Sequence, residues 1–172
     1  MEAVMDPDSM RDQKIEELIR LYQVPLLRLC YVQLQDKALA EDAVQETFMK
    51  AYRGFDSFRG ESSEKTWLCR IAVNVCRDFE RGSWFRHTDR RVTPDMLPEA
   101  AEPPAERDID LTLAIMALPR KLREAVILYY YQDMGTGEIA DALGIAQSSV
   151  SNRLKRGRDK LRKALEGRDQ DA

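Results

Sequence analysis

The sequence has little of what enzymes and metal proteins use. Of its 172 residues, one is histidine and three are cysteine (Cys30, Cys69 and Cys76, with no CxxC spacing). It contains no Gly-rich phosphate loop and no GxSxG or HExxH motif. We therefore expect no enzyme activity, no cofactor and no metal site. We expect the cysteines to be buried free thiols in a reducing compartment, with metal ligation as the weaker alternative.

Long apolar runs are also missing. No run approaches the roughly 20 residues that span a membrane. The first residues, MEAVMDPDSMRDQ, are acidic and lack the apolar segment of a signal peptide. We therefore expect a cytoplasmic protein.

Positive charge is in slight deficit overall but is concentrated at one place. The chain has 27 Lys and Arg against 30 Asp and Glu, a net charge of −3. The stretch SSVSNRLKRGRDKLRKAL, residues 148–165, nevertheless carries seven basic residues and one acid. This asymmetry predicts a localised anionic partner, and the solvated face of a helix is the alternative.

The apolar spacing predicts an all-α fold of two small domains. Residues 85–108 hold four of the seven prolines and no apolar periodicity, so they are interpreted as a flexible linker between domains at 10–84 and 109–167. We expect Pro25 to begin a helix, because proline is tolerated in a first turn. The predicted helices are 10–22, 25–35, 37–55 and 64–82, then 109–117, 120–132, 136–143 and 147–166.

The predicted helix 37–55 has two faces at 100° per residue. The core stripe contains Ala40, Val44, Phe48, Ala51, Tyr52 and Phe55. The opposite side carries Asp42, Glu46, Met49, Lys50 and Arg53. A solvated polar face is the simpler interpretation of that side. An adaptable methionine within it favours an interface instead.

The predicted helix 64–82 gathers basic residues on one stripe. Its core side contains Trp67, Leu68, Ile71, Val75 and Phe79, and its basic stripe contains Arg70, Asn74, Arg77 and Arg81. Guanidinium groups around an asparagine suit phosphates and a base edge, and a plain basic surface is the alternative. The preceding loop FDSFRGES adds aromatic and basic groups that suit unstacked bases. Core packing of Phe55 and Phe58 is the competing interpretation.

The C-terminal pattern is typical of a helix-turn-helix unit. In GEIADALGIAQSSV a short amphipathic helix ends at Gly144, which can take a left-handed conformation, and Ile145 then points inward. The next helix has a buried seam of Val150, Leu154, Leu161, Ala164 and Leu165. Because turn, seam and basic face coincide, we prefer a helix that reads a major groove to a solvated one.

The two halves together resemble the extracytoplasmic-function (ECF, group IV) sigma factors of bacterial RNA polymerase. The N-terminal half carries ALAEDAVQETFMKAYRGFDSFRG and KTWLCRIAVNVCRDF. The C-terminal half carries ALPRKLREAVILYYYQDMGTGEIADALGIAQSSVSNRLKRGRDKLRKAL. Either half would be suggestive, and both in this order are specific. The resemblance implies an alternative sigma factor that directs promoter-specific transcription initiation.

The resemblance implies three contact surfaces. The surface for the polymerase core would contain Asp42, Gln45, Glu46, Met49 and Lys50. The reader of the melted minus-ten element would contain Phe58, Arg59, Arg70, Asn74 and Arg77, with Asn74 matching a position that helps hold a flipped base. The minus-thirty-five reader would contain Ser148, Ser149, Ser151, Asn152, Arg153, Lys155, Arg156 and Arg158.

The resemblance also implies partners. These are the RNA polymerase core, promoter DNA and an anti-sigma factor, which in this family is often membrane-anchored, with no small-molecule substrate. The family usually has Gly-Thr-Val and then a basic residue in the recognition helix, where this chain has SSVS (148–151). This difference concerns which minus-thirty-five sequence is preferred. Two alternatives remain open: a helix-turn-helix regulator whose N-terminal half senses a ligand or dimerises, and a helical adaptor with a basic tail.

Overall fold

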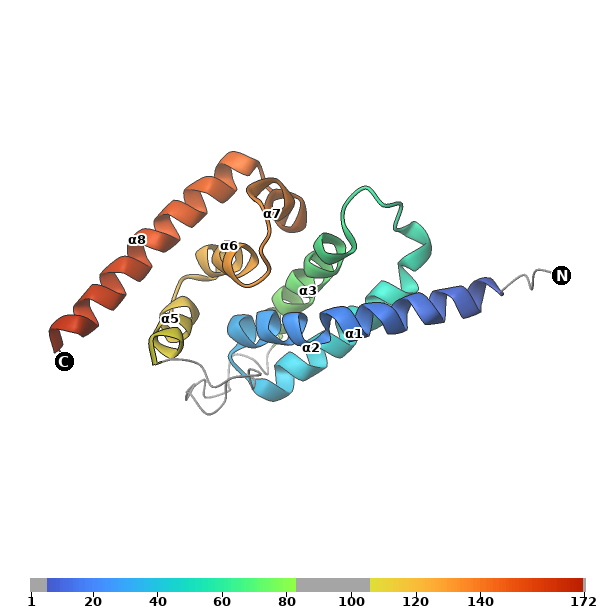
Figure 1. Cartoon of the computed structure of the whole chain (residues 1–172), viewed down its shortest axis with the longest axis horizontal. Coiled ribbons are helices and arrows are strands. Elements are labelled where there is room, and N and C mark those ends of the chain that lie inside the picture. The colour runs from blue at the N-terminus through green and yellow to red at the C-terminus, as the bar shows by residue number, and fades with distance from the viewer. Residues whose placement is uncertain (1–5, 83–105, 172) are drawn as a thin grey trace.

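The computed structural model describes residues 6–82 and 106–171, and within these ranges every regular element is a helix (Figure 1). The N-terminal half contains α1 (Pro7–Leu34), α2 (Lys37–Arg53), a 3₁₀ turn η1 (Phe55–Ser57) and α3 (Glu64–Arg81). The C-terminal half contains α5 (Glu106–Met116), α6 (Arg120–Tyr130), α7 (Thr136–Leu143) and α8 (Gln147–Asp171). The predicted all-α, two-part fold is confirmed.

The predicted break at Pro25 is wrong, because α1 runs continuously through it. A proline inside a helix leaves the carbonyl four residues earlier without its usual partner. That residue is Leu21, which is 55% exposed and so lies on the solvent side of α1. Leu18 and Leu26, on either side of the predicted break, are both buried in the same core. Packing of the two segments against one core therefore outweighs one lost hydrogen bond.

Side-chain caps set where the next helices begin. Asp36 accepts a hydrogen bond from the backbone N–H of Leu39 at 3.0 Å and begins α2. Ser63 accepts from the N–H of Thr66 at 3.1 Å and begins α3. Each cap satisfies one of the unpaired N–H groups of a first turn. The loop that holds the aromatic and basic residues is therefore fixed at its α3 end.

The predicted core is mostly correct on α2 and α3. Tyr52 is an exception, because it is 38% exposed and the guanidinium of Arg11 lies 5.5 Å from its ring centre. Cys30, Cys69 and Cys76 are buried and free, as expected. On α8, Ala164 was predicted in the seam but is exposed.

The helix-turn-helix geometry is present. Gly144 ends α7 with a φ of 66°, the left-handed conformation that glycine adopts without strain. Ile145 donates its N–H to the carbonyl of Ala140 at 3.1 Å and packs against the core. Further along α8, a Cβ on Gly157 would lie 2.8 Å from Cγ2 of Val126, so α8 and α6 approach closely there.

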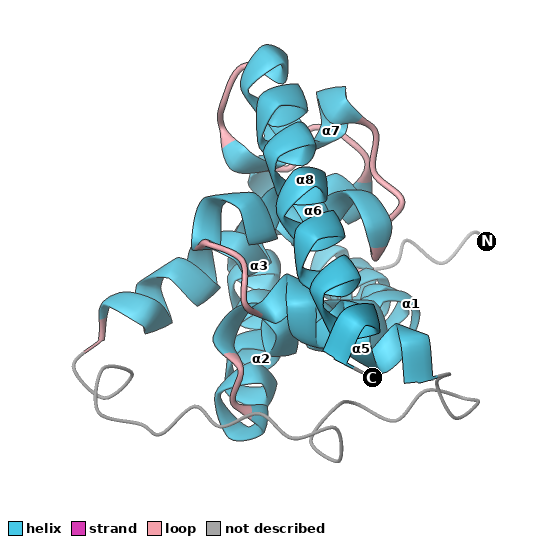
Figure 2. Ribbon diagram, turned by 90° about the vertical axis from the view of Figure 1, so that its left-hand side faces the viewer, coloured by secondary structure: helices cyan, strands magenta, loops and turns pink. Residues whose placement is uncertain are grey.

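The two halves pack against each other. Helix α3 packs on α7, and α1 contacts α5 and α6. Figure 2 shows α8 lying over α6 on the outer side of the C-terminal half. Helix α5 begins at Glu106, inside the predicted linker, and the remainder of that linker, 85–105, lies outside the described residues. Among the described residues no helix is long and apolar enough to cross a membrane.

Candidate nucleic-acid interfaces

The predicted reader on α3 borders a hollow of about 480 Å³. Phe58 and Arg59 from the loop and Arg70 from α3 line it together. The ring of Phe58 stacks on Trp67, with centroids 4.6 Å apart and planes 21° apart. Since the stack leaves Phe58 half-buried, its core-packing and base-stacking interpretations both keep support. The structure thus brings three of the five predicted minus-ten residues to one place.

Two of the three arginines of the α3 stripe contact the C-terminal half. Arg70 donates from Nε to the backbone carbonyl of Asp141 on α7 at 2.9 Å, and from Nη2 to the same oxygen. Arg77 makes a two-pronged contact with Glu124 on α6, with N–O distances of 3.0 and 2.8 Å. Asn74, between them, is exposed. Both guanidinium groups are therefore already bound within the molecule.

Glu124 is a buried carboxylate, only 2% exposed. Its strong partner is Arg77, whose Nη2 lies 2.8 Å from Oε2 of Glu124. Nε of Arg120, on the same helix as Glu124, lies 3.9 Å from Oε1. The hydrogen bond to Glu124 raises the pKa of Arg77. A buried carboxylate needs such a partner because desolvation otherwise makes its charge costly.

A second polar cluster lies beside this ion pair. Glu80 on α3 accepts from Gln33 Nε2 at 3.1 Å and lies 3.5 Å from Arg120 and 3.9 Å from Arg123. Burial raises the pKa of Glu80, and the two arginines oppose that shift. Gln33 also accepts a 3.4 Å hydrogen bond from Arg123. The cluster joins residues of α1 and α3 to residues of α6.

The predicted reader on α8 is open to solvent on its groove-facing side. Seven of its eight members are exposed: Ser148, Ser149, Ser151, Asn152, Lys155, Arg156 and Arg158. Val150 and Leu154 are buried on the opposite side and hold the helix to its domain. Arg153 is half-buried at the edge. The early turns of α8 can therefore enter a major groove without rearrangement of this domain.

Arg158 differs from the other predicted members. Its Nε donates to the hydroxyl of Tyr130 at 2.8 Å, and its guanidinium lies 5.1 Å from the ring centre of Tyr129. It also lines an apolar hollow of about 240 Å³ with Leu111, Ile115, Tyr130 and Leu161. The structure thus places Arg158 on the flank of α8, against its own domain. Its predicted role toward DNA stays a prediction.

The predicted polymerase surface on α2 combines polar and apolar groups. Asp42, Gln45 and Lys50 are exposed, and Glu46 is half-buried. Met49 is 49% exposed and borders an apolar hollow of about 290 Å³ lined also by Ile15, Ile19, Phe48, Tyr52 and Arg53. An exposed methionine beside such a hollow is typical of a protein interface.

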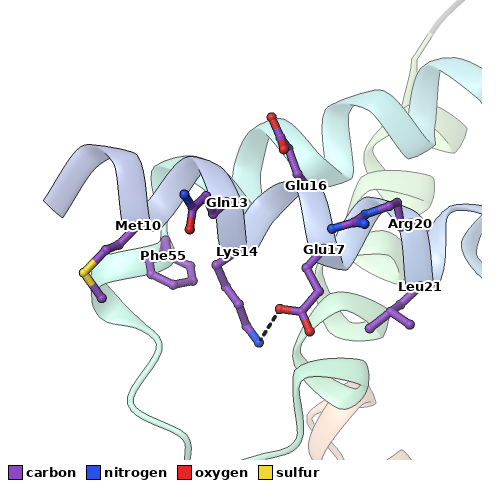
Figure 3. A pocket seen from close by; sticks show the side chains of 8 residues that line it. All are labelled: Met10, Gln13, Lys14, Glu16, Glu17, Arg20, Leu21 and Phe55. Carbon is purple, nitrogen blue, oxygen red and sulfur yellow. Dashed lines mark hydrogen bonds and ion pairs between the residues drawn. The ribbon is translucent and has the colours of Figure 1, made fainter. Parts of the chain in front are cut away.

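A hollow of about 870 Å³ lies along α1 and contains none of the predicted site residues (Figure 3). Met10, Leu21 and Phe55 contribute its apolar lining. Lys14 in its wall is paired with Glu17 at 3.2 Å and with Glu64 at 2.7 Å. In the part of the chain that the structure describes, no cluster of three or more His, Cys, Asp or Glu could hold a metal ion.

Sequence reasoning missed Glu124. The signal was present, because a single acid precedes the apolar run AVIL on the predicted helix 120–132. An acid at the start of such a run either caps a helix or is buried with a partner. Its partner Arg77 is 47 positions earlier in the chain, and helical spacing gives no information about that pairing.

Comparison with protein families matches both halves in the predicted order. The Sigma-70 region 2 family matches residues 18–86, and the Sigma-70 region 4 family matches residues 108–161. This result favours the sigma interpretation over the ligand-sensing regulator and over the adaptor.

Curated relatives agree along most of the chain. The ECF RNA polymerase sigma factor SigW of Bacillus subtilis (strain 168) is 31% identical over 163 residues, which cover 87% of each chain. SigM of the same organism, also an ECF RNA polymerase sigma factor, is 32% identical over 162 residues, covering 90% of this chain and 96% of its own. RNA polymerase sigma-H factor of Pseudomonas aeruginosa is 31% identical over 163 residues, covering 87% and 84%.

Solved structures share the fold. The sigma factor RpoE of Bartonella quintana, in complex with the anti-sigma factor NepR, has a TM-score of 0.69 and 28% identity, covering 91% of this chain and 98% of that one. CnrH, in complex with the cytosolic domain of CnrY, has a TM-score of 0.72 and 24% identity, covering 93% and 92%. The chain thus belongs to the extracytoplasmic-function sigma factors, the promoter-specificity subunits of bacterial RNA polymerase.

Proposed function

We propose that this sigma factor reads promoters with two separate surfaces while a third holds it to the polymerase core. The α3 stripe with its loop reads the minus-ten element, and the early turns of α8 read the minus-thirty-five element. The observation that carries the proposal is the solvent-exposed face of α8, with Asn152, Lys155 and Arg156 opposite a buried seam. Asparagine can pair with adenine and the basic side chains with guanine in a major groove.

The polymerase surface is the polar side of α2 around Glu46 and Met49. Its support is the exposed Met49 beside an apolar hollow, flanked by charged side chains. Such a surface buries apolar area at its centre and keeps a polar rim. The two promoter readers then act at high effective concentration on one polymerase. This explains how a chain with a net charge of −3 can bind DNA well only within a complex.

The division of labour follows the proposed domains. Residues 10–84 bind the core and the minus-ten element, 109–167 bind the minus-thirty-five element, and 85–108 connect them. The protein acts in the cytoplasm and catalyses no covalent step of its own. Melting proceeds by capture of unstacked bases near Asn74, which is exposed between two arginines.

An anti-sigma factor regulates the protein in this proposal. Its support is that two of the similar solved structures are complexes, one with the anti-sigma factor NepR and one with the cytosolic domain of CnrY. Purification of the tagged chain from its native cells should yield such a partner besides polymerase. Recovery of polymerase alone, in repeated preparations from unstressed cells, would argue against this regulation.

The direct test is a pull-down of core polymerase with a Glu46→Lys variant. The reversed charge on α2 should abolish or strongly reduce binding. If the polymerase surface is complementary to Glu46, a lysine there would face positive charge and be repelled. Glu166→Lys, the same change at an exposed position on α8, is the matched control and should bind as the wild type does. No binding by the wild type itself would contradict the proposed function.

Promoter reading is tested separately by run-off transcription from a random promoter library with reconstituted holoenzyme. Enrichment of two sequence blocks at fixed spacing is the expected result. Enrichment that is unchanged when Asn152 and Arg156 are both replaced by alanine would show that α8 does not read sequence.

A further inference from the structure

We propose that the free protein forms a weak two-fold dimer through one face of α1, with a second copy of this chain as the partner. The members of this face, called here the α1 stripe, are Pro7, Met10, Lys14, Glu17, Leu21 and Val24. The stripe shares no member with the proposed polymerase surface or with either DNA reader. The inference therefore goes beyond the proposed function and is tested separately from it.

The α1 stripe carries exposed apolar side chains. Met10 is 57% exposed, Leu21 is 55% exposed and Val24 is 53% exposed. These are three of the seven exposed large apolar residues in the described part of the chain. Figure 3 shows Met10 and Leu21 at opposite ends of the hollow of about 870 Å³, which Phe55 also lines. Exposed apolar side chains gathered on one face, with charged groups among them, are typical of a surface that binds another protein.

The spacing of the stripe is that of a helix that packs lengthwise against another helix. Successive members are separated by three, four, three, four and three residues, so they stay on one side of α1 over about 26 Å. This alternation is the coiled-coil repeat, in which side chains of one helix fit between those of the other. Ile15, Leu18 and Leu26, which hold α1 to its own domain, are buried on a different side of the helix. A second, exposed seam on the same helix predicts a helical partner.

The order of side chains makes the stripe complementary to an antiparallel copy of itself. An antiparallel pair centred midway between residues 15 and 16 places Met10 opposite Leu21 of the second copy. The same register places Pro7 opposite Val24 of the second copy, so apolar groups meet apolar groups. It also places Lys14 opposite Glu17 of the second copy, so opposite charges meet. Each contact occurs twice, because the two sides of a two-fold interface are the same surface.

Other pairings of the same stripe fit less well. A parallel pair places Lys14 opposite Lys14 and Glu17 opposite Glu17 of the second copy, so like charges meet. Sliding the antiparallel pair by seven residues in either direction places each charged member opposite an apolar one. A helix of an unrelated protein has no reason to repeat this order of apolar and charged groups. The pattern therefore specifies a second copy as the occupant and one register for it.

The charged centre of the stripe is already arranged in the monomer. Lys14 Nζ lies 2.7 Å from Glu64 at the start of α3 and 3.2 Å from Glu17. The hydrogen bonds to Glu64 and Glu17 raise the pKa of Lys14, so its side chain is charged at neutral pH. An ammonium group has three N–H donors and can also donate to Glu17 of the second copy. Because Lys14 is already held in place, less side-chain freedom is lost when the copies associate.

The oligomeric state of the full-length protein is measured by sedimentation velocity over a concentration series. A single helix pair buries less than the roughly 1,200–2,000 Å² of a standard interface, so we expect association between about 10 µM and about 1 mM. The average mass should rise from 19.8 kDa toward twice that value. A mass that stays at 19.8 kDa throughout the series would overturn the proposal.

The face is tested with two aspartate variants at similarly exposed positions. Leu21→Asp should weaken the dimer at least about tenfold, because it places a charge within an apolar contact. Met49→Asp is the matched control, since Met49 is 49% exposed on α2, and it should associate as the wild type does. Loss of association in Met49→Asp but not in Leu21→Asp would place the contact on α2 and contradict the proposal.

The register is tested by mixing two charge-reversed variants. Lys14→Glu and Glu17→Lys should each weaken self-association at least about tenfold, because like charges then face each other. An equimolar mixture should associate again, because each copy then presents the charge that the other lacks. A change within one chain cannot produce recovery on mixing, so recovery supports direct contact between two α1 stripes.

Circular dichroism shows whether both charge-reversed variants are folded. If loss of the Glu64 contact unfolds Lys14→Glu, the double variant Lys14→Glu with Glu64→Lys keeps that ion pair and takes its place in the mixture. Folded variants that fail to associate on mixing would overturn the antiparallel register.

Discussion

The two predicted DNA readers differ in what they contact within the protein. On α3, Arg70 and Arg77 are bound to oxygen atoms of the C-terminal half. On α8, Lys155 and Arg156 are exposed and face solvent. Both surfaces have the same chemistry, so composition cannot explain the difference. Its cause is position, because α3 lies between the halves and α8 lies on the outside (Figures 1 and 2).

The largest expected effect compares one arginine from each reader in the free protein. Arg156→Ala should weaken binding to a duplex selected from a random library by the wild-type protein, by about 1–3 kcal/mol or roughly 5- to 150-fold. Arg70→Ala should leave that affinity unchanged, because its guanidinium is bound to the Asp141 carbonyl. Fluorescence anisotropy at low salt measures both.

Within reconstituted holoenzyme the two variants should become alike, and each should reduce run-off transcription. An equal loss of duplex affinity for both variants in the free protein would show that the contact of Arg70 with Asp141 does not keep it from DNA. If Arg156→Ala bound the duplex as tightly as the wild type does, α8 would not be a DNA reader.

The second effect is on the attachment of α8 to its domain. Gly157→Ala places a Cβ 2.8 Å from Val126 Cγ2, so α8 must shift away from α6. We expect a loss of about 1–3 kcal/mol in the free energy of unfolding, as in other overpacked cores. Gly167→Ala in the same helix meets nothing within 4 Å and should instead stabilise by up to about 1 kcal/mol.

Urea unfolding followed by circular dichroism measures both glycine variants. Equal stabilities would mean that α8 is not held closely by α6. The α3 reader should be unaffected by either change, since neither glycine lies at the contact between the halves.

The faces of individual helices could be predicted from the sequence, and the contacts between the halves could not. Helical spacing placed Arg70, Asn74 and Arg77 on one stripe because only local geometry is involved. The pairing of Arg77 with Glu124 joins positions 47 residues apart, and no local pattern encodes it. The continuous α1 is a similar case, since tertiary packing across Pro25 outweighs a local rule.

Edge positions were the least predictable within a helix. Arg158 lies between the groove face and the buried seam of α8, so small differences in packing decide its role. The run of tyrosines at 129–131 supplied a ring and a hydroxyl, and Arg158 binds both. The sequence showed a basic residue near the reader but did not reveal these partners.

A smaller effect concerns ionic contacts of α8 with the DNA backbone. Arg162 is exposed one and a half turns beyond Arg156, where it suits a phosphate instead of a base. Arg162→Ala should lower the slope of log affinity against log salt by about 1 and weaken all duplex sequences alike. Titrations at several salt concentrations test this. An effect confined to one sequence would instead make Arg162 a base reader.

The smallest expected effect is the reactivity of the three thiols buried in the core of the N-terminal half. Burial raises the pKa of Cys69 to about 12. At pH 8 only about one molecule in 10⁴ then carries the reactive thiolate there, against roughly a quarter for an ordinary thiol. Native protein should therefore show almost no reaction with a chromogenic disulfide reagent at this pH, and urea-unfolded protein should react at all three cysteines.

The raised pKa of Cys69 also makes the free energy of unfolding depend on pH, because the folded form keeps its proton longer than the unfolded form does. The contribution of this thiol to that free energy should be full below pH 8 and fall as the pH rises toward 12. Cys69→Ala should lessen that fall in urea unfolding. Fast reaction of one thiol in native wild type would contradict the burial of the three cysteines.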